Sequence, residues 1–225
     1  MGRSTSGARH VLVKRYQQYT AREGLGDLTA PSGVRPHAAE HPMMVMVGES
    51  TGNKYMRAVP HKGIGPDGDN SWLVKDMHQD LKSWGHPGGG QSILILKSDG
   101  EPAIVAVREA LARFHGGRVT PEQPPPREHQ INGLAEVTGR LARDQARDVK
   151  LQLQHNIERE VLEDEPIMPW LLRWAAMSMP RFKTGKDGNT PHRRQKGRKC
   201  DMEVVLFGEP SYIASQRSRA TASGA

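Results

Sequence analysis

The sequence has a single cysteine, few aromatic residues and few large aliphatic ones. Cys200 alone excludes an intramolecular disulfide framework and any zinc site built from several cysteines. Aromatic residues make up 5% of the 225 residues, and Leu, Ile, Val and Phe together about 19%, which borders on the composition of disordered chains. No apolar run reaches the roughly 18 residues that a membrane-spanning helix needs, so we expect no membrane partner. Because large aliphatic residues are few, only segments in which they cluster can supply a packed core.

The charge of the sequence is unbalanced toward the positive side. The chain has 32 Lys and Arg against 25 Asp and Glu, a formal net charge of +7 and a pI near 9.7. A basic surface attracts polyanions, so nucleic acid is the favoured partner on charge alone. With 24 Gly and 16 Pro, a large share of the chain must form loops.

The distribution of apolar residues divides the chain into three parts. Residues 1–41 carry little periodicity and are expected to form an irregular leader, with one short strand at 11–13. Residues 42–180 hold the segments with clear strand or helix patterns and form the expected core. Residues 181–225 are basic and glycine-rich at first and polar at the end, so we expect a C-terminal extension that is partly disordered.

Within the core, the order of the patterns predicts an α/β fold. Apolar runs at 43–47 and 54–59 flank a Gly-rich turn and predict a hairpin, and the unbroken run at 93–96 predicts a strand buried on both faces. Apolar residues at helical spacing predict helices over 71–84, 103–114, 133–162 and 170–179, and residues 116–131 are expected to form a proline-rich loop. Strands and helices in this order pack as layers.

Two carboxylates stand at positions suited to chemistry. Asp99 comes just after the buried strand, where side chains of α/β sheets emerge at the functional edge, and Glu136 is expected in the first turn of the long helix. If that helix packs against the sheet edge, the two carboxylates meet, and paired carboxylates without nearby His or Cys suit a hard cation such as Mg²⁺. The alternative is structural: Asp99 caps the following helix and Glu136 is a solvated acid.

The residues around these two acids resemble the integrase catalytic core of LTR retrotransposons, of the copia or a related class. The resemblance rests on the pairing of SDGEPAI at 98–104 with NGLAE at 132–136. Shorter supporting pieces are TG at 51–52, VPHKG at 59–63, PWLLRWAA at 169–176, DGNTP at 187–191 and FGE at 207–209. Together they cover residues 42–210, about three quarters of the chain.

The resemblance implies a ribonuclease H-like three-layer fold with a mixed sheet, in which two aspartates and one glutamate hold Mg²⁺ or Mn²⁺. It makes Asp99 the second aspartate and Glu136 the glutamate. The first aspartate belongs on the first strand, and this strand looks weak or degraded here. Asp27 is the candidate for it, although GLGDLT at 24–29 is a poor strand sequence. Without a third carboxylate, two metal ions lack bridging ligands.

A basic stripe on the long helix predicts a DNA-binding face. Glu136, Arg140, Arg143, Arg147 and Lys150 recur at spacings of three or four residues and share one helix face. Cations in line with a metal site would hold phosphates and position the scissile bond. Asn132 is expected either to hydrogen-bond DNA or to cap the helix. The alternative for the stripe is a solvated face with local ion pairs to Asp144 and Asp148.

Three hypotheses follow. The first is a retroelement integrase core that trims DNA ends and transfers strands with Asp99, Glu136 and Asp27 as metal ligands. The second is a degenerate, non-catalytic DNA-binding remnant, and the third is a metal-dependent nuclease without strand transfer. The resemblance also implies DNA as a partner, self-association as a homo-oligomer and a nuclear location; otherwise a cytoplasmic location is expected.

Overall fold

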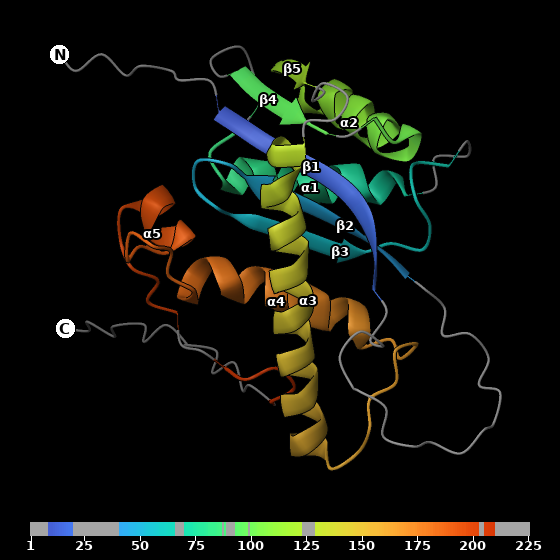
Figure 1. The fold of residues 1–225 in the computed structure, drawn as a ribbon, viewed down its shortest axis with the longest axis vertical. Helices are drawn as coiled ribbons and strands as arrows, with labels where there is room; N and C mark the ends of the chain where they lie inside the picture. The colour runs from blue at the N-terminus through green and yellow to red at the C-terminus, as the bar shows by residue number, and fades with distance from the viewer. Residues whose placement is uncertain are drawn as a thin grey trace, which may run out of the picture.

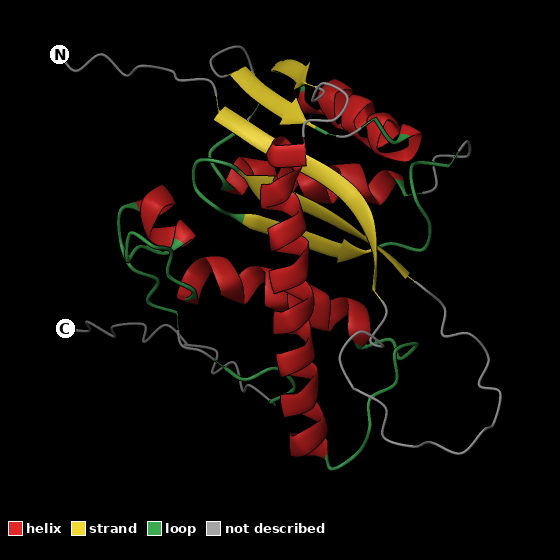
Figure 2. Ribbon diagram, in the orientation of Figure 1, coloured by secondary structure: helices red, strands yellow, loops and turns green. Residues whose placement is uncertain are grey.

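The structure is a computed structural model that describes residues 9–19, 41–65, 70–86, 88, 93–98, 100–122, 129–202 and 205–209. It is a mixed α/β fold built on one five-stranded sheet (Figures 1 and 2). The strands are β1 (Arg9–Tyr19), β2 (His41–Gly48), β3 (Lys54–Ala58), β4 (Ile93–Lys97) and β5 (Arg118–Glu122). The helices are α1 (Ser71–Ser83), α2 (Pro102–His115), α3 (His129–Ile157), α4 (Met168–Phe182) and α5 (Pro191–Lys196).

The sheet has the strand order β3-β2-β1-β4-β5. β1, β2 and β3 form an antiparallel meander, whereas β4 pairs parallel to β1 and β5 parallel to β4. The parallel pair β4–β5 is connected through α2, as a parallel connection requires. β1 is thus the strand that joins the antiparallel half of the sheet to the parallel half.

The second strand shows why the sheet needs helices on both faces. All five residues from Met43 to Val47 are buried, with exposed fractions of 0 or 1%. Met44 and Met46 belong to one core with residues of α1 and α2, whereas Met43, Val45 and Val47 belong to a second core with residues of α3 and α4. Because successive side chains of a strand point to opposite faces, an unbroken apolar run fits a strand covered on both sides. The result is three layers with the sheet in the middle.

Most of the elements expected in the core are confirmed. The β2–β3 hairpin, α1, β4, α2 and α4 lie where the apolar patterns predict them, within about three residues at each end. The N-cap of α1 is Asn70, which has a left-handed backbone and a side chain that donates to the carbonyl oxygens of His61 and Gly63. The long helix starts four residues earlier than expected and ends at Ile157, before Glu158 in the left-handed region.

Three elements differ from the sequence expectation. β1 spans eleven residues at the centre of the sheet, where the sequence analysis expected an irregular leader over 1–41 with only a short strand at 11–13. β5 lies in the segment expected to be a proline-rich loop, and as an edge strand it accommodates Pro121. α5 lies in the basic extension, where Thr190 caps it by accepting from the backbone N–H of Arg193 at 3.1 Å.

None of the helices in the described ranges is long and apolar enough to cross a lipid bilayer.

The second core predicts a large cost for shortening a side chain of α4. Leu171 of α4 is fully buried in the second core. Leu171→Ala leaves a cavity there, so it should lower the free energy of unfolding by about 2–5 kcal/mol. Leu151→Ala on α3 is the matched control, because that side chain is 53% exposed and its loss should change the stability by less than about 0.5 kcal/mol. Urea denaturation measures both. Equal effects of the two variants would contradict this packing.

A histidine pair between α1 and α2 predicts a pH-dependent stability. His78 and His115 place their Nδ1 atoms 3.4 Å apart, and burial lowers the pKa of both, with Lys82 lowering that of His78 further. The unfolded chain therefore takes up protons at these sites more readily than the folded one, so stability should fall as the pH drops below the ordinary pKa of 6.5.

The measurement is the urea midpoint at about pH 7.5 and about pH 5.5, a range in which histidine is the side chain that ordinarily titrates. The wild type should lose more stability across this range than the His78→Asn/His115→Asn double variant. His155→Asn, at an exposed position near the end of α3, should leave the wild-type loss unchanged. An undiminished loss in the double variant would contradict the assignment.

Candidate nucleic-acid interface

The end of β4 is the place where the sequence predicts the chemistry, and buried polar contacts fix it. Ser98, the residue after the strand, is buried and accepts a hydrogen bond from Arg108 of α2 at 3.0 Å. Its backbone N–H donates to the carbonyl oxygen of Glu122 at 3.2 Å. Lys97 lies between two acids, with Nζ 3.3 Å from Glu122 and 3.5 Å from Glu49. The strand end is therefore tied to α2, to β5 and to the β2–β3 turn.

The neighbouring strand brings no carboxylate to this place. Leu12 of β1 pairs with Lys97 of β4, so the positions of β1 beside the end of β4 are Val13, Lys14 and Arg15. The whole of β1, RHVLVKRYQQY, contains no Asp or Glu. The resemblance places the first aspartate of the metal site on the first strand, and β1 contains none.

Of the three predicted carboxylates, Glu136 is the one that lies in the described part of the chain. Asp27 and Asp99 lie outside the described residues, so their assignment as metal ligands stays a prediction. Glu136 is exposed on α3, two turns into the helix rather than in its first turn, because α3 begins at His129. The helix-dipole argument for a carboxylate at the first turn therefore does not apply to it. Within the described ranges, no three His, Cys, Asp or Glu side chains are grouped closely enough to hold a metal ion.

The long helix presents the predicted basic stripe on its outer side. α3 contacts β1 and β2 and crosses the sheet on the face opposite α1 and α2 (Figure 1). Its packed face consists of Thr138, Ala142, Ala146, Val149 and Leu153. The stripe lies beside this face: Arg140 and Arg147 are exposed, and Arg143 and Lys150 are half-buried.

Local pairing reduces the charge of the stripe only in part. Arg147 lies 3.6 Å from Asp144, one turn earlier, and both side chains are about half exposed, so this pair is worth little. Of the local ion pairs to Asp144 and Asp148 that the alternative expects, the described side chains show the one between Arg147 and Asp144. Asn132 lies in the first turn of α3 and therefore does not cap the helix, and its side chain is outside the described part.

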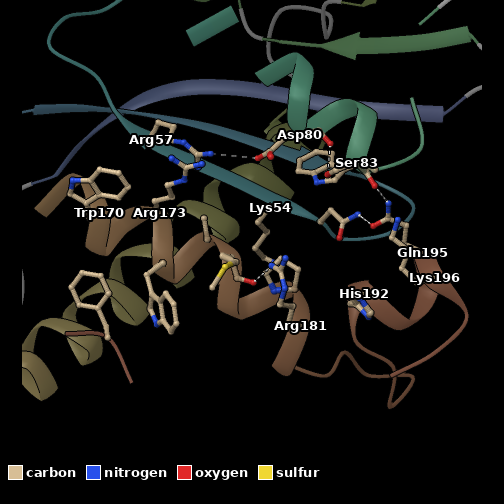
Figure 3. Close-up of a pocket in the computed structure, with 17 residues that line it drawn as sticks. Lys54, Arg57, Asp80, Ser83, Trp170, Arg173, Arg181, His192, Gln195 and Lys196 are labelled. Atoms are coloured by element: carbon tan, nitrogen blue, oxygen red, sulfur yellow. Dashed lines mark hydrogen bonds and ion pairs between the residues drawn. The ribbon is translucent and has the colours of Figure 1, made fainter. Parts of the chain in front are cut away.

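A second basic region, which the sequence analysis missed, lies at the β3 edge of the sheet. A cavity of about 550 Å³ opens between β3, the end of α1, α4 and α5 (Figure 3). Its lining includes the cations Lys54, Arg57, Arg173, Arg181 and Lys196 and the aromatic residues Trp84, Trp170, Trp174 and Phe207. These residues come from segments far apart in the chain, although Trp170, Arg173 and Trp174 lie in the PWLLRWAA motif and Phe207 in FGE.

The polar network beside this cavity holds β3 against α1. Arg57 Nε lies 2.7 Å from Asp76, Arg57 Nη2 lies 3.8 Å from Asp80, and the Arg57 guanidinium stacks 4.4 Å from the centroid of the Tyr55 ring. The Tyr55 hydroxyl donates to Asp76 at 2.9 Å. Burial raises the pKa of Tyr55, so its hydroxyl stays protonated, and burial also raises the pKa of the Asp80 carboxyl. The network leaves Asp80 as the acid that faces the cavity.

Comparison with known proteins identifies the fold. No family model matches the sequence, and no curated protein matches it. A solved structure of the HTLV-2 integrase catalytic core domain in complex with magnesium matches 84% of this chain and 97% of its own, at 10% identity and a TM-score of 0.50. A chain of the simian T-cell lymphotropic virus intasome in complex with PP2A regulatory subunit B56 gamma matches 94% of this chain, at 10% identity and a TM-score of 0.54. The fold is integrase-like.

The integrase-like fold agrees with the resemblance seen in the motifs. The chain spans 62% of the length of the simian virus chain that it matches.

Proposed function

We propose that this chain is an integrase-like, ribonuclease H-like protein of retroelement origin that binds DNA along α3. The supporting observation is the position of the basic stripe: Arg140 and Arg147 are exposed on the outer side of the helix that crosses the central strands. Asn132, Arg143 and Lys150 complete the proposed contact surface. The net charge of +7 supports the same partner, because phosphate contacts dominate the affinity of proteins for DNA. The copia-like origin rests on the sequence motifs.

For the chemistry, we propose that the chain is a non-catalytic relative. Two metal ions that clamp a phosphodiester need bridging carboxylates. The first strand contains no Asp or Glu, and the positions that follow its last residue paired with β4, Leu12, are Val13, Lys14 and Arg15. The lack of a carboxylate on β1 favours a protein that holds DNA without cutting it.

The second candidate is an active integrase that uses Asp99 and Glu136 with Asp27 as the third carboxylate and Mg²⁺ or Mn²⁺ as the metal. It is supported by the pairing of SDGEPAI with NGLAE, the motif that gives the resemblance. A metal-dependent nuclease without strand transfer would use the same acids. Self-association and a nuclear location are further proposals that come from the resemblance.

Removing charges from the stripe should weaken DNA binding. The Arg140→Gln/Arg147→Gln variant should raise the Kd for duplex DNA about tenfold and reduce the salt slope by about two, because each lost phosphate contact releases one counterion fewer. Fluorescence anisotropy across a salt series measures both quantities.

The control for this experiment removes the same charge from the opposite side of the sheet. Lys75→Gln/Arg113→Gln changes two exposed cations on α1 and α2 and should leave the Kd close to that of the wild type. An equal loss of DNA affinity in both double variants would show that binding depends on net charge alone and would contradict the proposed α3 surface.

A strand-transfer assay decides between the two chemical candidates. With Mg²⁺ or Mn²⁺ and a short duplex end, the wild type should give no joined or cleaved product, and Glu136→Gln should behave identically. Joined product from the wild type that disappears in Glu136→Gln would establish the active integrase and overturn the non-catalytic proposal. Cleavage without joining would establish the nuclease.

A further inference from the structure

The cavity at the β3 edge shares no residue with the proposed DNA surface, because no residue of α3 lines it. The cavity opens between β3, the end of α1, α4 and α5, with a volume of about 550 Å³. That volume lies within the range of about 300–1,000 Å³ that small-molecule sites occupy. A separate ligand therefore has room to bind here.

The charges in the cavity are mainly positive and only partly compensated. Lys54 Nζ donates to the carbonyl oxygen of Gly52 at 3.0 Å, and Arg181 Nη1 donates to that of Met177 at 2.7 Å. Within the described part of the chain neither cation forms an ion pair with a carboxylate within 4 Å, although the charge of Arg181 acts on Asp80 against the burial that raises the pKa of that carboxyl. Burial together with the positive charges of Lys183 and Arg194 lowers the pKa of Lys54. An anionic ligand would relieve this repulsion.

An apolar, aromatic wall stands beside the cations. The Trp170 side chain is 60% exposed although it is large and apolar, and the Arg173 guanidinium lies 5.9 Å from its ring centroid. Trp174 and Phe207 form a tilted ring pair with centroids 6.0 Å apart on the same lining. A ligand that is only an anion would use the cations and leave this wall unused. The lining thus suits a ligand with a phosphate at one end and a flat ring at the other.

The lining is held in place by contacts from α5. Gln195 accepts from Asn53 Nδ2 at 2.8 Å and donates to the carbonyl oxygen of Ser83, so it joins α5 to β3 and α1. Arg194 donates to the carbonyl oxygen of Thr51 at 3.1 Å and pairs with Asp187. Figure 3 shows Gln195 between Ser83 and the β3 side, with His192 and Lys196 on the same helix. The site is therefore preorganised without a ligand.

We propose that this cavity binds a nucleotide, either free or as an unpaired residue of a single-stranded nucleic acid. Its phosphate contacts Lys54, Arg181 and Lys196, and its base stacks on Trp170. The proposal does not rest on the function proposed above, because it uses none of the residues of α3 or of the carboxylate motifs.

The test is a calorimetric titration of the full chain with deoxyadenosine monophosphate. The wild type should bind it saturably, and Arg181→Gln and Trp170→Ala should each weaken binding about tenfold, since a lost phosphate contact or a lost stacked base costs about that much. Lys196→Gln, at an exposed position, should weaken binding as well and guards against misfolding of the Arg181 variant. Circular dichroism shows that each variant is folded.

Two further ligands distinguish the sources of the nucleotide. An oligothymidylate of about ten residues that binds more tightly than the mononucleotide, with the same dependence on Trp170, identifies single-stranded nucleic acid as the source. Equal or weaker binding of the oligonucleotide identifies a free nucleotide. Pyrophosphate should compete with both but bind more weakly than the mononucleotide, because it cannot use Trp170.

The proposal is overturned if the wild type does not bind the mononucleotide at millimolar concentration. It is also overturned if Trp170→Ala binds as tightly as the wild type, since the cavity would then hold phosphate alone. Arg147→Gln on α3 should leave mononucleotide binding unchanged, and Arg181→Gln should leave the duplex affinity unchanged. This reciprocal pattern separates a failure of the cavity from a failure of the α3 surface.

Discussion

The pairing of β1 with two different strands is the constraint on which the rest of the fold depends. On one side β1 forms an antiparallel ladder with β2, and on the other a parallel ladder with β4. The β2–β3 hairpin and the β4–β5 pair have no other connection through the sheet. Both cores draw on strands from this sheet, so the placement of all the main helices follows from these two ladders.

Local patterns in the sequence are enough to predict the elements that bury continuous or periodic apolar residues. Met43–Val47 and Leu94–Leu96 read as strands, and α1, α2 and α4 read as helices, because each carries its own apolar face. β1 carries only three consecutive apolar residues among basic and polar ones, so its length comes from backbone pairing with neighbours on both sides. β5 and α5 are likewise defined by tertiary contacts.

The candidate sites also differ in how far the sequence alone predicts them. The basic stripe of α3 could be predicted because helical spacing places its residues on one face, and the exposure of Arg140 and Arg147 agrees with that prediction. The cavity at the β3 edge could not be predicted, because its lining is brought together from β3, α1, α4 and α5 by the tertiary fold. The metal site stays a prediction for Asp27 and Asp99. The strand to which the resemblance assigns the first aspartate contains no Asp or Glu.

Hydrogen–deuterium exchange of the full chain tests the central claim most directly. If β1 is the inner strand of the sheet, amides of Val11 to Lys14 should exchange as slowly as those of Leu94 to Leu96 in β4, because both require global unfolding to open. Exchange of the β1 amides within seconds, with β4 still protected, would contradict the account. The sheet would then lack its central strand, and the integrase-like arrangement would not hold.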